Sequence, residues 1–171
     1  TDDSSCVYAH MRDPAYNAFL IVTLVVFVDA VGQHFMSPAL VPLARSLGAD
    51  EGGVALLLTS RSIAALVSGF WLPLVADTRG RKVAMFLSCL GSTAGYFMQG
   101  SVLFCSAEFG RELLLYGKIV EGLFSQTMPA ALGYISDITP DLAQLRTRTT
   151  TVYAMNQIVP VAIAPIGGLV A

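Results

Sequence analysis

The sequence has few charged residues. Of its 171 residues only 13% are charged, with 10 lysines and arginines against 12 aspartates and glutamates. With a net charge of -2 and no stretch that interleaves basic and aromatic residues, the chain lacks the positive surface that nucleic acid binding requires. We therefore expect no nucleic acid among its partners.

Histidine and cysteine are also scarce. The histidines, His10 and His34, belong to no Ser/His/Asp, HExxH or phosphate-binding-loop pattern. The cysteines, Cys6, Cys89 and Cys105, form no CxxC pair and lie at no metal-ligand spacing from a histidine. The sequence therefore predicts no enzyme, no metal site and no cofactor.

Long apolar runs dominate the rest of the chain. Hydrophobic residues make up 54% of the sequence and gather in runs that approach or exceed the roughly 20 residues that a helix needs to cross a bilayer. The runs cover about residues 16–43, 53–76, 83–106, 113–138 and 149–171. Lipid offers the backbone no hydrogen bonds and the runs lack the alternation of a barrel strand, so each is predicted to be a transmembrane helix. The predicted fold class is all-α: a polar tail at 1–15 and a polytopic membrane bundle of five helices at 16–171.

Positive charge is unequally shared among the segments that join these runs. The tail and the second and fourth connections hold Arg12, Arg79, Arg81, Lys82, Arg146 and Arg148. The first and third connections hold only Arg45 and Arg111. By the positive-inside rule, the N-terminus and the turn at 77–82 face the cytoplasm or the equivalent side of an organelle. The sequence does not indicate which membrane holds the protein.

The turn at 77–82 carries the most specific motif. The segment PLVADTRGRK, residues 73–82, resembles the signature G-x-L-a-D-r-x-G-R-K of the major facilitator superfamily. The matching positions are Asp77, Gly80, Arg81 and Lys82, while Pro73 replaces a glycine and Thr78 replaces a cation. In that family the motif lies between the second and third helices, and the resemblance implies a cytoplasmic gate there. From the residues themselves, Gly80 favours a tight turn with positive φ.

Other segments resemble the same family in the same order, above all its drug/proton antiporter branch, which includes the tetracycline antiporters. The first run has an acid at Asp29, in the family's intramembrane acid position. In the fourth run, Lys118 and Gly122 take the places of an Arg-x-x-x-Gly motif. The segment AIAPIGG is similar to the G-P-x-x-G-G motif of the fifth helix, with one residue fewer after Pro165. The resemblance implies helices one to five of the usual twelve, so we expect the bundle to be incomplete at the C-terminus.

Ionisable residues interrupt the apolar runs at Asp29, Arg61, Lys118 and Glu121. Each costs at least about 2.5 to 3.5 kcal/mol near the bilayer centre, and so should face a cavity or a partner. Asp29 shares one side of its helix with Gln33 and His34. At 1.5 Å per residue, Asp29 lies about 20 Å and Arg61 about 24 Å from the cytoplasmic end. We therefore expect these two residues to be partners.

The role of this expected pair stays open between two interpretations. The vesicular amine transporters resemble the sequence here, with an acid and a cation at the same places. In one interpretation Asp29 and Arg61 form a buried ion pair that only fixes helix packing. In the other, Asp29 takes up a proton or the cationic group of a solute, with Arg61 as its counter-ion.

The fourth run carries a polar stripe on an otherwise apolar helix. Its members are Lys118, Glu121, Gly122, Ser125 and Gln126. These residues follow helical spacing, and by the resemblance the first and fourth helices line a central cavity. Lys118, Glu121 and Gln126 are therefore candidates for a shared site with Asp29, and Asn156 in the fifth run is another. The alternative is a local salt bridge between Lys118 and Glu121.

Two functions from different classes fit these observations. The first is the N-terminal portion of a proton-coupled secondary transporter of small, cationic or zwitterionic solutes, working by alternating access. Its partners are lipid, solute, protons and a missing C-terminal half, and its candidate residues are Asp29, Gln33, His34, Arg61, Lys118, Glu121, Gln126 and Asn156. The alternative is a facilitator-derived structural subunit that does not transport and packs against partner subunits in a larger membrane complex.

The depth assignment of Arg61 is testable by charge reversal. Arg61→Glu is expected to lower the thermal unfolding midpoint in detergent more than Arg45→Glu, because only Arg61 lies in the hydrocarbon layer. Arg45, in a polar connection, is the matched control. Equal tolerance of the two reversals would place Arg61 at the wrong depth.

Overall fold

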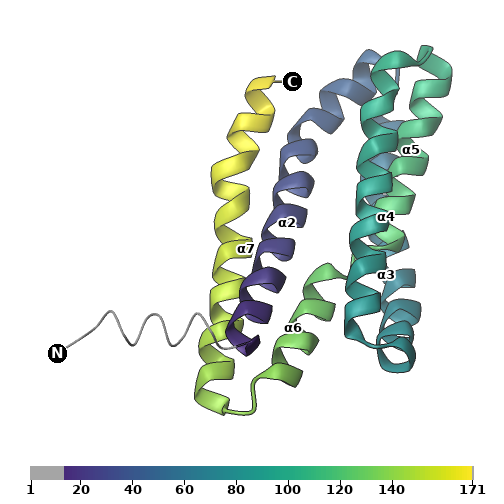
Figure 1. Ribbon diagram of the computed structural model, residues 1–171. Helices are drawn as coiled ribbons and strands as arrows, with labels where there is room; N and C mark the ends of the chain where they lie inside the picture. Colours follow the sequence, from purple (N-terminus) through teal and green to yellow (C-terminus); the bar gives the residue numbers. More distant parts are fainter. Residues whose placement is uncertain (1–13, 171) are drawn as a thin grey trace.

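The computed structural model describes residues 14–170 and consists of helices (Figure 1). They are α2 (Pro14–Ser46), α3 (Glu51–Arg79), α4 (Arg81–Ser101), the 3-10 turn η1 (Val102–Phe104), α5 (Ala107–Leu123), α6 (Thr127–Ile138) and α7 (Leu142–Val170). No strand occurs in this range, so the predicted all-α class is confirmed. Most of the predicted tail at 1–15 lies outside the described residues.

The run predicted as one helix at 113–138 is two helices in the structure. Helix α5 begins earlier, at Ala107, and ends at Leu123, and α6 begins at Thr127. Pro129 favours the break, because a proline inside a helix lacks an N–H and clashes with the carbonyl of the residue four positions earlier. Proline alone does not decide it, since other prolines lie inside the unbroken helices α2, α3 and α7. In the first turn of a new helix the missing N–H costs nothing, so the chain restarts just before Pro129. The prediction of one continuous helix was wrong here.

The helices form two groups (Figure 1). Helix α2 packs along α7, with α6 beside them, and α5 packs against both α3 and α4. In Figure 1 the start of α2, the α3–α4 turn and the α6–α7 connection lie at the lower end. The α2–α3 connection and η1 lie at the upper end. By length and apolarity alone, α2 and α3 qualify as membrane spans, and their 33 and 29 residues exceed what an about 30 Å hydrocarbon layer requires.

The apolar core is divided into three clusters away from the middle of the bundle. One joins α2, α6 and α7 through Phe19, Val22, Val26, Ala131, Ile135 and Val152. A second joins α2, α3, η1 and α5 through Leu40, Ala44, Val54, Leu57, Val102 and Leu114. The third joins α3 and α4 through Leu72, Ala76 and Ala84. The level between these clusters is therefore left to polar side chains.

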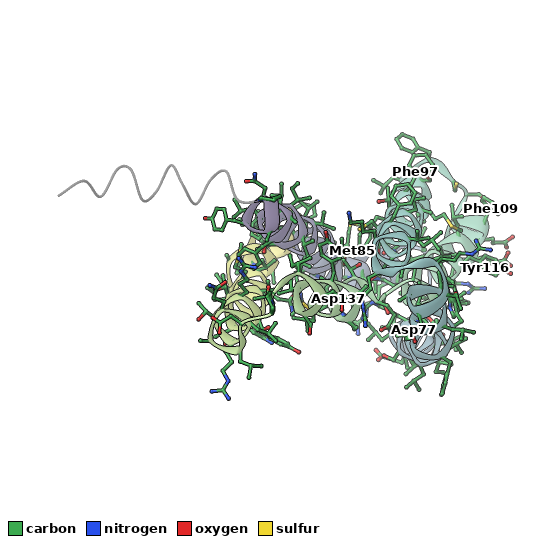
Figure 2. All side chains as sticks on the ribbon, turned by 60° about the horizontal axis from the view of Figure 1, so that its bottom comes forward. Asp77, Met85, Phe97, Phe109, Tyr116 and Asp137 are labelled. Atoms are coloured by element: carbon green, nitrogen blue, oxygen red, sulfur yellow. The ribbon has the colours of Figure 1, made fainter. Side chains whose placement is uncertain are left out.

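Large apolar side chains cover the outside of the bundle. Phe70, Phe97 and Phe104 are 82%, 76% and 92% exposed. Figure 2 shows Phe97 and Phe109 projecting from the outer side of the group formed by α3, α4 and α5. An apolar exterior around a partly polar interior matches a lipid solvent, in which apolar side chains are exposed at no cost.

Two turns depend on helix-end chemistry. The Asp50 carboxylate accepts a hydrogen bond from the Gly53 N–H at 2.8 Å and so caps the start of α3. Gly80 both ends α3 and precedes α4, with φ of 95°. The predicted positive φ of Gly80 is confirmed, and other residues would be strained there.

Glycines set the close approach of α5 to α3 and α4. A Cβ on Gly95 would lie 2.9 Å from the Gly117 carbonyl oxygen. A Cβ on Gly122 would meet the Arg61 carbonyl oxygen and would lie 2.7 Å from the Ala64 Cβ. At both glycines the backbones touch, which side chains would prevent.

Replacing Gly122 is expected to separate α5 from α3. Gly122→Ala should destabilise the bundle by about 1–3 kcal/mol, because the added methyl overlaps backbone that cannot move aside. The matched control is Gly100→Ala in α4, where an added Cβ meets nothing within 4 Å. This control should be neutral or stabilising by about 0.5–1 kcal/mol. Chemical unfolding in detergent measures both, and equal stability of the two variants would contradict the packing.

Candidate functional site

Between the apolar clusters lies a cavity of about 110 Å³ to which α2 through α7 all contribute. We call it the central cavity. Its polar lining residues are Asp29, Gln33, Arg61, Ser92, Tyr96, Glu121, Ser125, Thr127 and Asn156. A polar cavity of this size holds a few water molecules or the polar end of a small solute.

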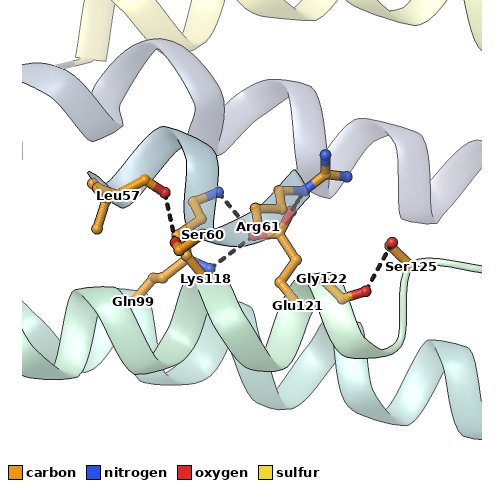
Figure 3. Close-up of polar contacts among 8 residues, drawn as sticks. All are labelled: Leu57, Ser60, Arg61, Gln99, Lys118, Glu121, Gly122 and Ser125. Atoms are coloured by element: carbon orange, nitrogen blue, oxygen red, sulfur yellow. Dashed lines mark hydrogen bonds and ion pairs between the residues drawn. The ribbon is translucent and has the colours of Figure 1, made fainter. Parts of the chain in front are cut away.

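Arg61 and Glu121 of the central cavity lining belong to a charge cluster that also contains Gln99 and Lys118 (Figure 3). Arg61 Nε donates to Glu121 Oε1 at 2.7 Å, and Lys118 Nζ donates to Glu121 Oε2 at 2.8 Å. Gln99 Nε2 donates to the same Oε2 at 3.0 Å. The Glu121 side chain is only 1% exposed, so it is held as a buried anion by two cations and an amide. Removing one partner of such a pair costs about 3–5 kcal/mol.

The predicted partnership between Asp29 and Arg61 is not the one that forms. Arg61 pairs with Glu121, because Gly122 brings α5 into backbone contact with α3 at Arg61. Helix α2 contacts α3 over far fewer residues. Asp29 and Arg61 nevertheless line the same cavity, in keeping with the depth expected from the sequence.

Asp29 forms no ion pair with a cation within residues 14–170. The hydroxyl side chains of Thr127 and Ser92 line the same cavity and lie near its carboxylate. Thr127 is the first residue of α6, where the free N–H groups of a helix favour a negative charge. Asp29 and Glu121 therefore line one cavity, but cations neutralise the charge of Glu121 and, among the described residues, only neutral groups adjoin Asp29 directly.

The break between α5 and α6 is held by Ser88 of α4. Its hydroxyl contacts the Phe124 carbonyl, accepts a hydrogen bond from the Gln126 N–H at 3.2 Å and bonds the Thr127 hydroxyl at 2.8 Å. The Phe124 ring occupies the space above Gly91 and packs edge-on against Trp71, with centroids 5.3 Å apart. Ser88 thus satisfies backbone groups that the break frees and that lipid could not satisfy.

The remaining candidates divide between this cavity and other places. Gln33 lines the central cavity and also a second cavity of about 140 Å³, the upper cavity, which Lys118 lines too. Asn156 reaches the central cavity from α7. His34 is half-buried and lines neither cavity. Gln126 turns away and donates to Ser68 Oγ at 3.0 Å, because the helix ends before it and the predicted stripe stops.

The sequence analysis missed a polar stripe on α4. Ser88, Ser92, Tyr96 and Gln99 recur at spacings of four, four and three, and all face α5, α6 or the cavity. This spacing is the signal of one helix face, and it could have been found in the apolar run at 83–106.

The motif residues at 77–82 tie the α3–α4 turn to α6. Arg81 Nε pairs with Asp137 Oδ2 at 2.9 Å, and its guanidinium crosses Gly133. Lys82 lies over the Tyr134 ring, 5.6 Å from its centroid. Asp77 and Asp137 both lie at the end that comes forward in Figure 2. Within residues 14–170 Asp77 forms no ion pair. Arg81 of the motif therefore pairs with Asp137 of α6 and not with Asp77 of the same motif.

Comparison with known proteins identifies the family. Residues 22–171 match the sequence profile of the Major Facilitator Superfamily. The chain belongs to the major facilitator superfamily. It is 31% identical over 121 residues to solute carrier family 22 member 18 of Rattus norvegicus, covering 70% of this chain and 29% of that protein. No solved structure matches the chain.

Two further relatives of this facilitator chain have similar identity. Solute carrier family 67 member A1 of Homo sapiens is 28% identical over 71% of this chain and 28% of its own length. The class B tetracycline resistance protein of Escherichia coli is 28% identical over 70% of this chain and 28% of its own length. The chain thus spans less than a third of these curated relatives. Its relatives are integral membrane transporters rather than enzymes.

The role of Ser88 at the helix break is open to a direct test. Ser88→Ala is expected to destabilise the bundle by about 1–3 kcal/mol and to speed hydrogen exchange over residues 124–127, because buried backbone groups lose a partner. The control is Thr93→Val on the exposed side of α4, whose hydroxyl bonds only its own helix at Cys89. Unfolding and hydrogen-exchange mass spectrometry in detergent measure both. Unchanged exchange over 124–127 in Ser88→Ala would remove Ser88 from this role.

Proposed function

We propose that this chain is the N-terminal part of a proton-coupled secondary transporter that moves small, cationic or zwitterionic solutes by alternating access. Membership of the superfamily supports transport. The class B tetracycline resistance protein, from the family's antiporters, supports exchange for protons. The geometry of the site supports Asp29 as the residue that couples transport to protons.

The observation that carries the proposal is the contrast between two carboxylates in one cavity. Glu121 is bound by both Arg61 and Lys118. Within residues 14–170, Asp29 forms an ion pair with no cation, although it lines the same cavity as Arg61. Protonating Glu121 would break two buried ion pairs, whereas protonating Asp29 breaks none. Asp29 is therefore the group that exchanges a proton or a cationic solute group.

The other candidate residues take supporting roles. Gln33, Asn156 and the free part of Arg61 supply hydrogen bonds to solute in the central cavity. Lys118 holds Glu121 in place, and Glu121 holds Arg61. His34 and Gln126, which lie outside the cavity lining, would contact solute only in a second conformation.

The lower end of Figure 1 is proposed as the cytoplasmic side. There the described residues hold Arg79, Arg81, Lys82, Arg146 and Arg148, against Arg45 and Arg111 at the other end. The ion pair of Arg81 with Asp137 joins the α3–α4 turn to α6 across the boundary between the two helix groups. We assign it to the cytoplasmic gate, since a contact across this boundary must change if the groups move.

Neutralising Asp29 is expected to separate proton coupling from folding. In liposomes containing the full-length protein, Asp29→Asn should abolish the part of solute uptake that a pH gradient drives, because the amide cannot exchange a proton. The unfolding midpoint should stay near that of the wild type, since the amide has the same shape as the carboxylate and Asp29 has no ion pair to lose within residues 14–170. Uptake of a panel of small organic cations and zwitterions, with and without a pH gradient, measures the coupling.

Glu108→Gln is the control, because Glu108 is an exposed acid in the first turn of α5. Its uptake should match the wild type. Undiminished coupling in Asp29→Asn would assign proton exchange to another residue. Absence of uptake by the wild type would favour a structural subunit that does not transport.

A further inference from the structure

Arg61 has hydrogen-bond donors that no described residue uses. A guanidinium carries five N–H groups. The N–H on Nε of Arg61 donates to Glu121, and neither terminal nitrogen bonds any residue within 14–170. Figure 3 shows these terminal nitrogens directed away from the Glu121 carboxylate.

These free donors lie where a solute would bind. Arg61 lines both the central and the upper cavity, and its side chain is 28% exposed. The bond from Nε to Glu121 restrains the guanidinium and leaves the fork of its two terminal nitrogens on the far side. A planar fork of this kind matches the two oxygens of a carboxylate.

The charges around the cavity define what such a solute must carry. The charge cluster has one net positive charge, because Arg61 and Lys118 share the single carboxylate of Glu121. Asp29 adds one negative charge on the same cavity. A solute with one anionic and one cationic group leaves this balance intact, whereas a simple cation or anion adds a net charge to a low-dielectric interior.

We propose that the solute is a zwitterion whose carboxylate binds the terminal nitrogens of Arg61 and whose cationic group binds Asp29. This narrows the proposed transport function and rests on it. Lys118 does not line the central cavity that holds Asp29, and its ammonium is bound to Glu121, so we assign it no contact with the solute. Arg61 is then a specificity-determining residue, and Glu121 is the residue that positions it.

Matched sets of small molecules test the assignment in the wild-type, full-length protein. One set contains zwitterions such as glycine betaine and small amino acids. Each is compared with a cation that lacks the carboxylate, such as choline, and an anion that lacks the ammonium, such as 3,3-dimethylbutanoate. Zwitterions are expected to raise the thermal unfolding midpoint and to accumulate in liposomes, and their matched ions are not.

Arg61→Lys isolates the fork from the charge. Lysine keeps one positive charge opposite Glu121 but loses the paired donors, so zwitterion affinity should fall about 10- to 100-fold. Arg45→Lys is the control, because the exposed Arg45 bonds only Glu51, at 3.1 Å. Its zwitterion affinity should equal that of the wild type.

Four results would overturn the assignment, and only the last of them also overturns the proposed function. Cations without a carboxylate that bind as tightly as their zwitterions would refute it, while their pH-driven uptake would leave proton-coupled transport standing. Tighter binding of the anions, or equal affinity in Arg61→Lys and the wild type, would also refute it. If no member of any set binds or accumulates, the proposed function fails together with this inference.

Discussion

The fold depends on the burial of one carboxylate among three helices. Glu121 of α5 is bound by Arg61 of α3, Gln99 of α4 and Lys118 one turn earlier. An unpaired charge here would be intolerable, so these helices have to approach until the donors reach it. The approach is possible because Gly95, Gly117 and Gly122 let the backbones touch. The buried ion pairs therefore require α3, α4 and α5 to approach closely, and the glycines allow them to do so.

That constraint leaves α2 and α7 less tightly bound to the rest, whereas α6 packs against both α4 and α2. The α5–α6 break lies between the two groups, and Ser88 satisfies its backbone from α4. The break also turns the first residue of α6, Thr127, toward Asp29. Asp29 thus belongs to the second group, while Glu121 belongs to the first. In the proposed function, relative movement of the groups alters the surroundings of Asp29 and spares those of Glu121.

Hydropathy and the charged turn predicted much of this architecture, but they did not predict which charged side chains pair inside it. Apolar runs located α2, α3, α4 and α7, since lipid leaves helix as the solution for such runs. The partner of Arg61 depended on which helices touch, and that was decided by Gly122, a residue with almost no hydropathy signal. The break before Thr127 was not predictable from Pro129 alone, because prolines also lie inside the unbroken helices α2, α3 and α7. The stripe from Ser88 to Gln99 was hidden because hydroxyls and amides barely lower the hydropathy of a span.

The proposed transport of a zwitterion needs one fixed charge and one exchangeable charge within reach of the same molecule. A cavity walled only by closed ion pairs would reject ligands, because each pair would have to open first. Arg61 meets the first need, since Glu121 holds its Nε and leaves its terminal nitrogens unused. Asp29 meets the second, since within residues 14–170 it forms no ion pair and shares its cavity with the hydroxyls of Ser92 and Thr127. Two carboxylates of the same chemistry thus acquire different roles, because one was packed among cations and the other against the start of a helix.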